Sequence, residues 1–268
     1  MEGFALPMFD LSSLPVVVTG SLGSLITGLL TGVGALPIFF RAKWGRTSQV
    51  IMLAVAAGVM LAATVFSLVV PAMNFAAARF GNDLLAALIA SGGIVLGALS
   101  IWLVHGVVPH EHFEKGAEGR PLALGRHWLF ILAITLHNFP EGMSVGVAYG
   151  GGVTAGLTVT LGIGLQNLPE GLAVAAALLG DGFSRRRAFW IALLTGLIEP
   201  VGGLVGALAV SLSSALLPWG LAFAAGAMLF VVSGEVIPET HLKGAEHKAT
   251  FSLVLGFIVM MILDVTLG

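Results

Sequence analysis

Long runs of apolar residues, separated by short polar segments, follow one another along the chain. Each run has roughly the 20 residues that an α-helix needs to cross the hydrocarbon core of a membrane. We therefore predict an all-α integral membrane protein whose eight transmembrane helices form a single polytopic membrane domain over residues 1–268. The predicted helices lie at residues 16–40, 48–72, 83–108, 128–149, 153–180, 187–212, 218–236 and 250–267.

Composition agrees with this class and excludes others. Hydrophobic residues make up 57% of the chain and charged residues only 10%, with a mean hydropathy of +1.01. Such a chain has too little polar surface for a soluble domain. The absence of cysteine excludes a thiolate metal site. A net charge of −2 provides no basic surface for nucleic acid, so the expected surroundings are the lipid bilayer.

The positions of the basic residues predict the orientation of the helices. Because basic loops stay on the cytoplasmic side of a membrane, both termini are expected outside. The acidic N-terminal segment lacks the basic start of a signal peptide, and we expect a multi-pass protein of a bacterial inner membrane. All the Lys and Arg residues but Arg79 fall in alternate loops, at positions 41, 43, 46, 115, 120, 126, 185, 186, 187, 243 and 248.

A short motif occurs twice, as HNFPEGM at residues 137–143 and as QNLPEGL at residues 166–172. The fourth and fifth predicted helices run in opposite directions, so the motif is presented twice in inverted orientation. A weaker pair, AGVML at residues 57–61 and AGAML at residues 225–229, lies in the antiparallel second and seventh helices. We therefore predict that helices 1–3 and 6–8 form an inverted repeat around helices 4 and 5, a common plan for transporters.

Four ionisable residues lie near the middle of predicted helices. At a rise of about 1.5 Å per residue, all four reach a similar depth although they come from three helices. Ionisable groups at the helix centre cost about 2.5–3.5 kcal/mol each on insertion scales, and they mark function by default. The residues are His137, Glu141, Glu170 and Glu199.

Spacing places further polar side chains beside them. Residues three and four positions apart share a helix face, and Pro140, Pro169 and Pro200 are expected to kink the helices there. Oxygen and imidazole ligands without thiolate suit Zn²⁺, Mn²⁺, Fe²⁺ or Co²⁺ and disfavour Cu⁺. The predicted faces comprise His137, Asn138 and Glu141 on helix 4, and Gln166, Asn167 and Glu170 on helix 5.

A second group of His and Glu residues lies toward the predicted cytoplasmic ends of the helices. These residues are candidates for receiving released metal, although solvated His and Glu are also common at helix ends. The group comprises His110, His112, Glu235, Glu239 and His241.

Together these motifs resemble those of the ZIP (ZRT/IRT-like) divalent metal transporters, in their GufA-type branch. The resemblance covers essentially the whole chain and includes GLIEPVGG at residues 196–203 and VIPETH at residues 236–241. It implies uptake of Zn²⁺ into the cytoplasm, with Cd²⁺, Fe²⁺, Mn²⁺ or Co²⁺ as further substrates and without a cofactor. Helices 1, 4, 5 and 6 would move as a transport bundle against helices 2, 3, 7 and 8.

The resemblance also implies a site for two metal ions, with Glu141 and Glu170 shared between them. Some bacterial relatives have Asp where this chain has Asn167, so the second position lacks one carboxylate here. The remaining ligands would be His137 and Gln166 at the first position, and Asn138, Asn167 and Glu199 at the second.

Two other functions are left open by the residues alone. The same His and Glu side chains would serve a proton-coupled carrier of another solute. An intramembrane metalloprotease would use them around Zn²⁺, but such enzymes often carry H-E-x-x-H, and the nearest string, HEHFE at residues 110–114, departs from it. We therefore predict a transporter and not an enzyme. The oligomeric state is open, with a homodimer as one option.

Overall fold

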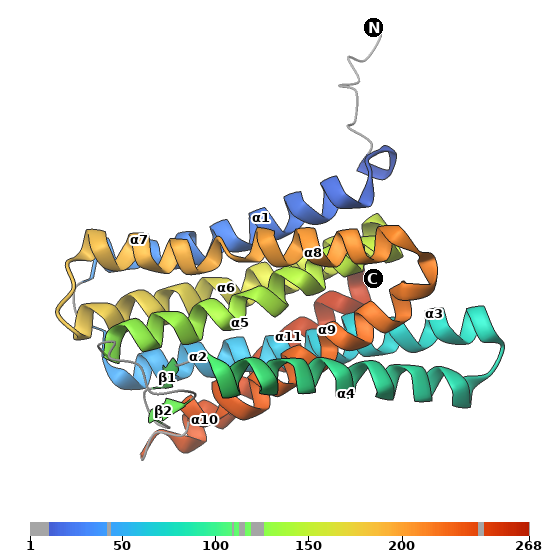
Figure 1. Cartoon of the computed structure of the whole chain (residues 1–268). Helices are drawn as coiled ribbons and strands as arrows, with labels where there is room; N and C mark the ends of the chain where they lie inside the picture. Colours follow the sequence, from blue (N-terminus) through green and yellow to red (C-terminus); the bar gives the residue numbers. More distant parts are fainter. Residues whose placement is uncertain are drawn as a thin grey trace, which may run out of the picture.

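The computed structural model describes residues 11–41, 44–108, 110–112, 116–118, 126–240 and 244–267, and Figure 1 shows them as a bundle of long helices. The α-helices are α1 (Val16–Ala35), α2 (Arg46–Ala62), α3 (Val70–Phe80), α4 (Asp83–Val107), α5 (Arg126–Ala148), α6 (Val153–Gly180), α7 (Arg185–Gly196), α8 (Glu199–Leu212), α9 (Leu217–Val231), α10 (Ile237–Glu239) and α11 (Glu246–Leu267). Short 3₁₀ helices lie at Leu11–Ser13, Leu36–Phe39, Tyr149–Gly151 and Ser214–Leu216.

The helices form two groups. Figure 1 shows α1, α5, α6, α7 and α8 along one side of the bundle and α2, α3, α4, α9 and α11 along the other. Within the first group α1 packs on α6 and α5 packs on α8, and within the second α2 packs on α11 and α4 packs on α9. We call these sets the α5–α6 group and the α4–α9 group.

Seven helical spans in the described part of the chain are long and apolar enough to cross a membrane. A further helix, α5, has 23 residues but carries polar side chains at its middle, which lower its apolarity. The chain is therefore a multi-pass helical membrane protein. The seven spans are Val16–Phe39, Arg46–Phe80, Asp83–Val107, Val153–Gly180, Arg185–Leu212, Ser214–Glu239 and Glu246–Leu267.

Proline positions explain where the helices depart from regular geometry. Two π-helical segments, Ala63–Val69 and Val232–Val236, come just before Pro71 and Pro238. A proline ring clashes with the preceding turn and removes an N–H, and a π-helical turn is one way to absorb that clash. The second membrane span consequently continues to Phe80, beyond the predicted end at residue 72.

The prolines of the fourth, fifth and sixth spans lie in different settings. Pro140 and Pro169 lie inside uninterrupted helices, whereas the sixth span is broken between α7 and α8, just before Pro200. The all-α class is confirmed, and one short antiparallel strand pair, β1 (His110–His112) with β2 (Gly116–Glu118), lies between α4 and α5. The two strands lie outside the membrane spans, so every described span is helical.

Local sequence sets several helix ends. Gly81 ends α3 in the left-handed conformation with φ of 63°, which glycine adopts without steric cost. The next residue, Asn82, begins α4 by accepting a hydrogen bond from the Leu85 N–H at 2.9 Å, as helix N-caps do. The tight Gly–Asn connection therefore joins α3 and α4 as antiparallel neighbours.

Close glycine contacts join the helices of the α4–α9 group at matched positions. A Cβ added at Gly226 of α9 would overlap the Ile94 carbonyl oxygen of α4, and one added at Gly58 of α2 would overlap the Leu253 carbonyl oxygen of α11. Gly58 and Gly226 occupy the same place in the AGVML and AGAML strings. Small residues allow such close approach in lipid. The matched contacts support the inverted repeat, which stays a prediction.

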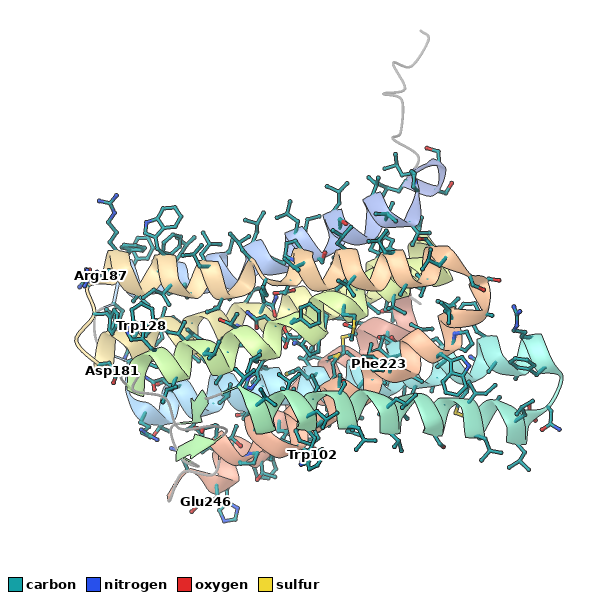
Figure 2. All side chains as sticks on the ribbon, in the orientation of Figure 1. Trp102, Trp128, Asp181, Arg187, Phe223 and Glu246 are labelled. Carbon is teal, nitrogen blue, oxygen red and sulfur yellow. The ribbon has the colours of Figure 1, made fainter. Side chains whose placement is uncertain are left out.

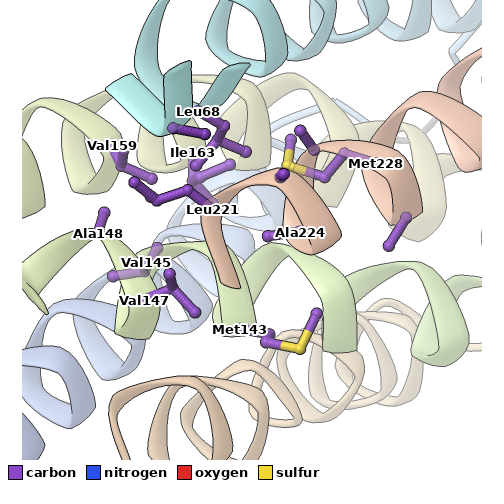
Figure 3. Packing of buried hydrophobic residues seen from close by; sticks show 14 of the residues in the cluster. Leu68, Met143, Val145, Val147, Ala148, Val159, Ile163, Leu221, Ala224 and Met228 are labelled. Carbon is purple, nitrogen blue, oxygen red and sulfur yellow. The ribbon is translucent and has the colours of Figure 1, made fainter. Parts of the chain in front are cut away.

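Apolar side chains fill the space between the two groups of helices. Figure 3 shows Leu68, Ile163 and Leu221 meeting at the centre, and these belong to one buried cluster with side chains of α5, α6 and α9. Figure 2 shows Asp181, Arg187 and Glu246 at one end of the bundle. The outer surface of α4 exposes apolar side chains, such as Trp102 with 58% of its surface exposed, as expected for a lipid-facing helix.

We expect Gly97→Ala to destabilise the fold, because its Cβ would meet the backbone of Phe223 and Ala227 on α9. Overpacking of this kind costs about 1–3 kcal/mol. The matched control is Gly106→Ala in the same helix, where nothing lies within 4 Å of the added carbon. Thermal unfolding in one detergent should show a lower midpoint for Gly97→Ala alone. Equal midpoints would contradict this packing.

Candidate metal centre

The motif faces of α5 and α6 are turned into the interior of the bundle. Both helices lie in the α5–α6 group and contact each other. The polar side chains that the motif spacing places on one face of each helix therefore form one buried polar region, surrounded by apolar packing. The buried side chains in it are His137, Asn138 and Glu141 from α5, and Gln166, Asn167 and Glu170 from α6.

The break between α7 and α8 brings in Glu199. α7 ends at Gly196 and α8 begins at Glu199, with Pro200 in the first turn. Proline is tolerated there because the first N–H groups of a helix have no intrahelical partner. Glu199 is fully buried, and the N-terminus of α8 favours a negative charge at this position. The broken helix thus delivers the third carboxylate of the site.

Amide side chains hold two of the three carboxylates. The Nε2 of Gln166 donates a hydrogen bond to Glu141 Oε1 at 2.7 Å, which links α6 to α5. The Nδ2 of Asn167 donates to Glu199 Oε1 at 2.7 Å and to the Thr27 carbonyl oxygen at 2.8 Å. These bonds tie α1, α6 and α8 together around the site.

Several polar atoms of the site have no hydrogen-bond partner among the described residues. The free energy cost of an unsatisfied buried polar group is about 1–3 kcal/mol, and in native structures each such group calls for an explanation. Oxygens of this kind are typical ligands of divalent metal ions, and rotation of the Asn138 amide would present its oxygen instead. The unpartnered atoms are Glu141 Oε2, Glu199 Oε2, Gln166 Oε1, Asn138 Nδ2 and Thr31 Oγ1.

The carboxylates and imidazoles by themselves are not arranged as a closed metal site. Within the described residues, no three His, Asp or Glu side chains have the spacing to hold a metal ion. Glu141 and Glu199 each accept a hydrogen bond from an amide side chain of α6. Amide oxygens can also bind hard divalent ions, so Asn and Gln count among the candidate ligands of this region.

A buried His–Glu–His cluster lies beside the motif residues. The Nε2 of His137 bonds Glu235 Oε2, and the Nε2 of His105 lies 3.1 Å from Glu235 Oε1. Only 2% of the Glu235 side chain is exposed. The His137–Glu235 bond uses Nε2, so Nδ1 is the ring atom that can bind a metal, and a carboxylate behind a ligating His is a common arrangement. This bond joins the α5–α6 group to the α4–α9 group.

Sequence reasoning missed His105 and the contact between Glu235 and His137. A single His in the apolar run of α4 is the signal that identifies His105, by the same rule that identified Glu141. Glu235 lies in the last turns of the span Ser214–Glu239, where it was predicted, and there it contacts His137. Both residues extend the site toward α4 and α9.

A cavity of about 360 Å³ leads from the site to one end of the bundle. Its deep end is lined by the buried residues His137, Glu170 and Glu235. The opposite end is lined by the exposed residues Arg46 and Asp181, and Asp181 marks the end of the bundle in Figure 2. The cavity therefore opens toward the loops that carry the basic residues.

The remaining residues of the predicted release group have different positions. Glu239 of α10 is half-buried and lines the same cavity. His110 and His112 belong to strand β1, and the structure describes their backbone only. His241 lies outside the described residues. A role for this group in metal release stays a prediction.

The described residues form a multi-pass membrane bundle with buried carboxylates, a broken helix beside them and a cavity that opens at one end. These features are typical of an ion transporter. The profile of the family described as "ZIP Zinc transporter" matches residues 108–264. The chain belongs to this family, whose members are transporters and not enzymes.

Relatives match almost the full chain. The zinc transporter GufA of Myxococcus xanthus is 48% identical over 254 residues, which cover 93% of this chain and 99% of the relative. The zinc transporter ZIPB of Bordetella bronchiseptica is 45% identical, covering 89% of this chain and 78% of the relative. The human zinc transporter ZIP11 is 35% identical, covering 92% and 96% respectively.

We expect His105 and Glu235 to be energetically coupled. Replacing either residue removes the contact between them, although Glu235 can still bond His137 when His105 is replaced. Residues in one such network show coupling energies of about 0.5–3 kcal/mol. A double-mutant cycle with His105→Ala, Glu235→Ala and the double variant measures this coupling from unfolding in metal-free buffer. Additive effects of the two substitutions would contradict the cluster.

Proposed function

We propose that this chain transports a divalent metal ion, with Zn²⁺ as the main substrate, through the buried site between α5 and α6. The observation that supports this most is the group of buried carboxylate and amide oxygens that have no hydrogen-bond partner in the described part of the chain. They lie in the interior of a membrane bundle, where unpaired carboxylates are costly. A divalent cation supplies both the missing charge and the missing coordination.

We assign His137, Glu141, Gln166 and Glu170 as the ligands of the transported ion. The two carboxylates balance the two positive charges, and charge–charge attraction is stronger in a low-dielectric interior than in water. Imidazole and oxygen ligands without thiolate suit Zn²⁺ and also accept Cd²⁺, Fe²⁺, Mn²⁺ or Co²⁺. No cofactor is needed, because the metal is the substrate.

The ion leaves along the cavity lined by Glu170, Glu235 and Glu239. Basic loops mark the cytoplasmic side of a membrane protein, and Arg46 lies at the open end of this cavity. We therefore propose uptake into the cytoplasm, in an inner membrane and with both termini outside. The described conformation is the one that releases the ion inward.

Alternating access requires the two groups of helices to move relative to each other. The surfaces between them are mainly small or flexible apolar side chains, such as Ala224 and Met228 on α9, which adapt to new neighbours more easily than polar ones. The His137–Glu235 bond crosses this boundary. We propose that the α5–α6 group carries the ion and that this bond holds the inward-open conformation.

We expect Glu141→Ala to reduce Zn²⁺ uptake at least about tenfold, because even residues behind metal ligands change affinity 10–100-fold. The measurement is Zn²⁺ entry into proteoliposomes that contain a zinc-sensitive dye. The control is Glu246→Ala, an exposed glutamate at the start of α11, which should retain uptake. Undiminished flux in Glu141→Ala would refute the assigned site. Solute-dependent currents that chelators do not affect would favour a proton-coupled carrier.

Zn²⁺ affinity should fall as pH falls from 8 to 5. Carboxylate and imidazole ligands must be deprotonated to bind metal, so protons compete with the ion. We expect the dissociation constant to rise at least about tenfold over this range. Equilibrium dialysis of the purified protein at each pH measures it. A flat profile would contradict direct ligation by Glu141, Glu170 and His137.

A further inference from the structure

Matched contacts show that the polar site has two related halves. A Cβ added at Gly142 would overlap the Glu199 carbonyl oxygen, and one added at Gly171 would overlap the Thr31 carbonyl oxygen. Gly142 and Gly171 occupy the same place in the HNFPEGM and QNLPEGL motifs. Thr31 of α1 therefore stands in one half where Glu199 of α8 stands in the other.

The hydroxyl groups near these positions repeat the same relation. Thr27 Oγ1 donates to the Ser24 carbonyl oxygen at 2.9 Å, and Thr195 Oγ1 donates to the Ala192 carbonyl oxygen at 2.8 Å. Thr27 lies four residues before Thr31, and Thr195 lies four residues before Glu199. The backbone framework is thus alike in both halves, and the halves differ in the side chains at the centre.

Asn167, which belongs to the half that contains Thr31, binds across to Glu199 in the other half. Both hydrogens of the Asn167 Nδ2 are used, one on Glu199 Oε1 at 2.7 Å and one on the Thr27 carbonyl oxygen at 2.8 Å. The corresponding amide in the half that contains Glu199, Asn138 Nδ2, has no partner among the described residues. Glu199 also lies at the N-terminus of α8, which stabilises its charge further.

Charge balance separates one bound ion from two. Of the four buried glutamates, Glu235 is paired with His105 and His137. The other three, Glu141, Glu170 and Glu199, remain, and one divalent ion neutralises two of them. The third, Glu199, is stabilised by the amide of Asn167 and by the start of α8. A second divalent ion would bring four positive charges to three carboxylates, and unbalanced charge is costly in a buried site.

We propose that this transporter binds a single divalent ion in the membrane, at His137, Glu141, Gln166 and Glu170. Asn167 is a positioning residue: its neutral amide donates a hydrogen bond to Glu199. This bond stabilises the carboxylate that a second ion would otherwise have to neutralise. This inference rests on the proposed function and replaces the two-ion arrangement that the family resemblance implies. It also predicts that a fourth carboxylate, introduced by Asn167→Asp, restores charge balance for two ions.

The test counts bound ions in the full chain. Purified protein in detergent is dialysed against saturating Cd²⁺, and bound Cd²⁺ per chain is measured by elemental analysis. The count for the Glu141→Gln/Glu170→Gln variant is subtracted, which removes ions held elsewhere, such as at exposed His residues. The same subtraction is made in the Asn167→Asp background.

We expect a difference of about one ion for the unmodified chain and about two for Asn167→Asp, in line with the charge balance above. If Asn167 had a purely structural role, Asn167→Asp would lower the number of bound ions or leave it unchanged, and would not raise it. A difference of two in the unmodified chain would overturn the inference while leaving the proposed metal site intact. A difference of zero would instead refute that site.

If Asn167→Asp does not fold, the ion count of the unmodified chain still tests the inference. This count depends on no substitution at position 167, and size-exclusion profiles show whether the Gln variants remain folded. If Asn167→Asp folds and still binds one ion, Asn167 does not set the number of ions, and that part of the inference is wrong.

Discussion

The structure depends on one physical constraint: the motif helices and α8 bury three carboxylates inside a membrane protein, beside a fourth on Glu235, and each must find a partner there. Glu141 and Glu199 accept hydrogen bonds from amide side chains on α6, but each keeps one oxygen without a partner among the described residues. In the proposed function, a divalent cation supplies the missing partner.

Close helix packing makes this arrangement possible. Lipid provides no hydrophobic drive for helices to associate, so contact between small residues has to hold them. Gly142 and Gly171 let the backbones of α8 and α1 approach the motif helices directly beside the ligands. A larger residue at either place would move Glu199 or Thr31 away from the site. The glycines of the motifs thus set the geometry that the glutamates use.

Local patterns in the sequence predict much of this account, and long-range contacts supply the rest. The apolar runs and the i, i+4 spacing of His137 and Glu141 identify the helices and the motif faces. The contact of His137 with Glu235, and the two bonds of Asn167, depend on how distant helices pack. The π-helical segments also escape prediction, because a proline can kink, break or widen a helix.

The most direct test of the central claim is zinc X-ray absorption spectroscopy on purified protein loaded with one equivalent of Zn²⁺. The account predicts a shell of oxygen and nitrogen ligands that includes an imidazole contribution, and the loss of that contribution in His137→Ala. A spectrum that His137→Ala leaves unchanged would place the ion elsewhere and contradict the assignment of the buried site.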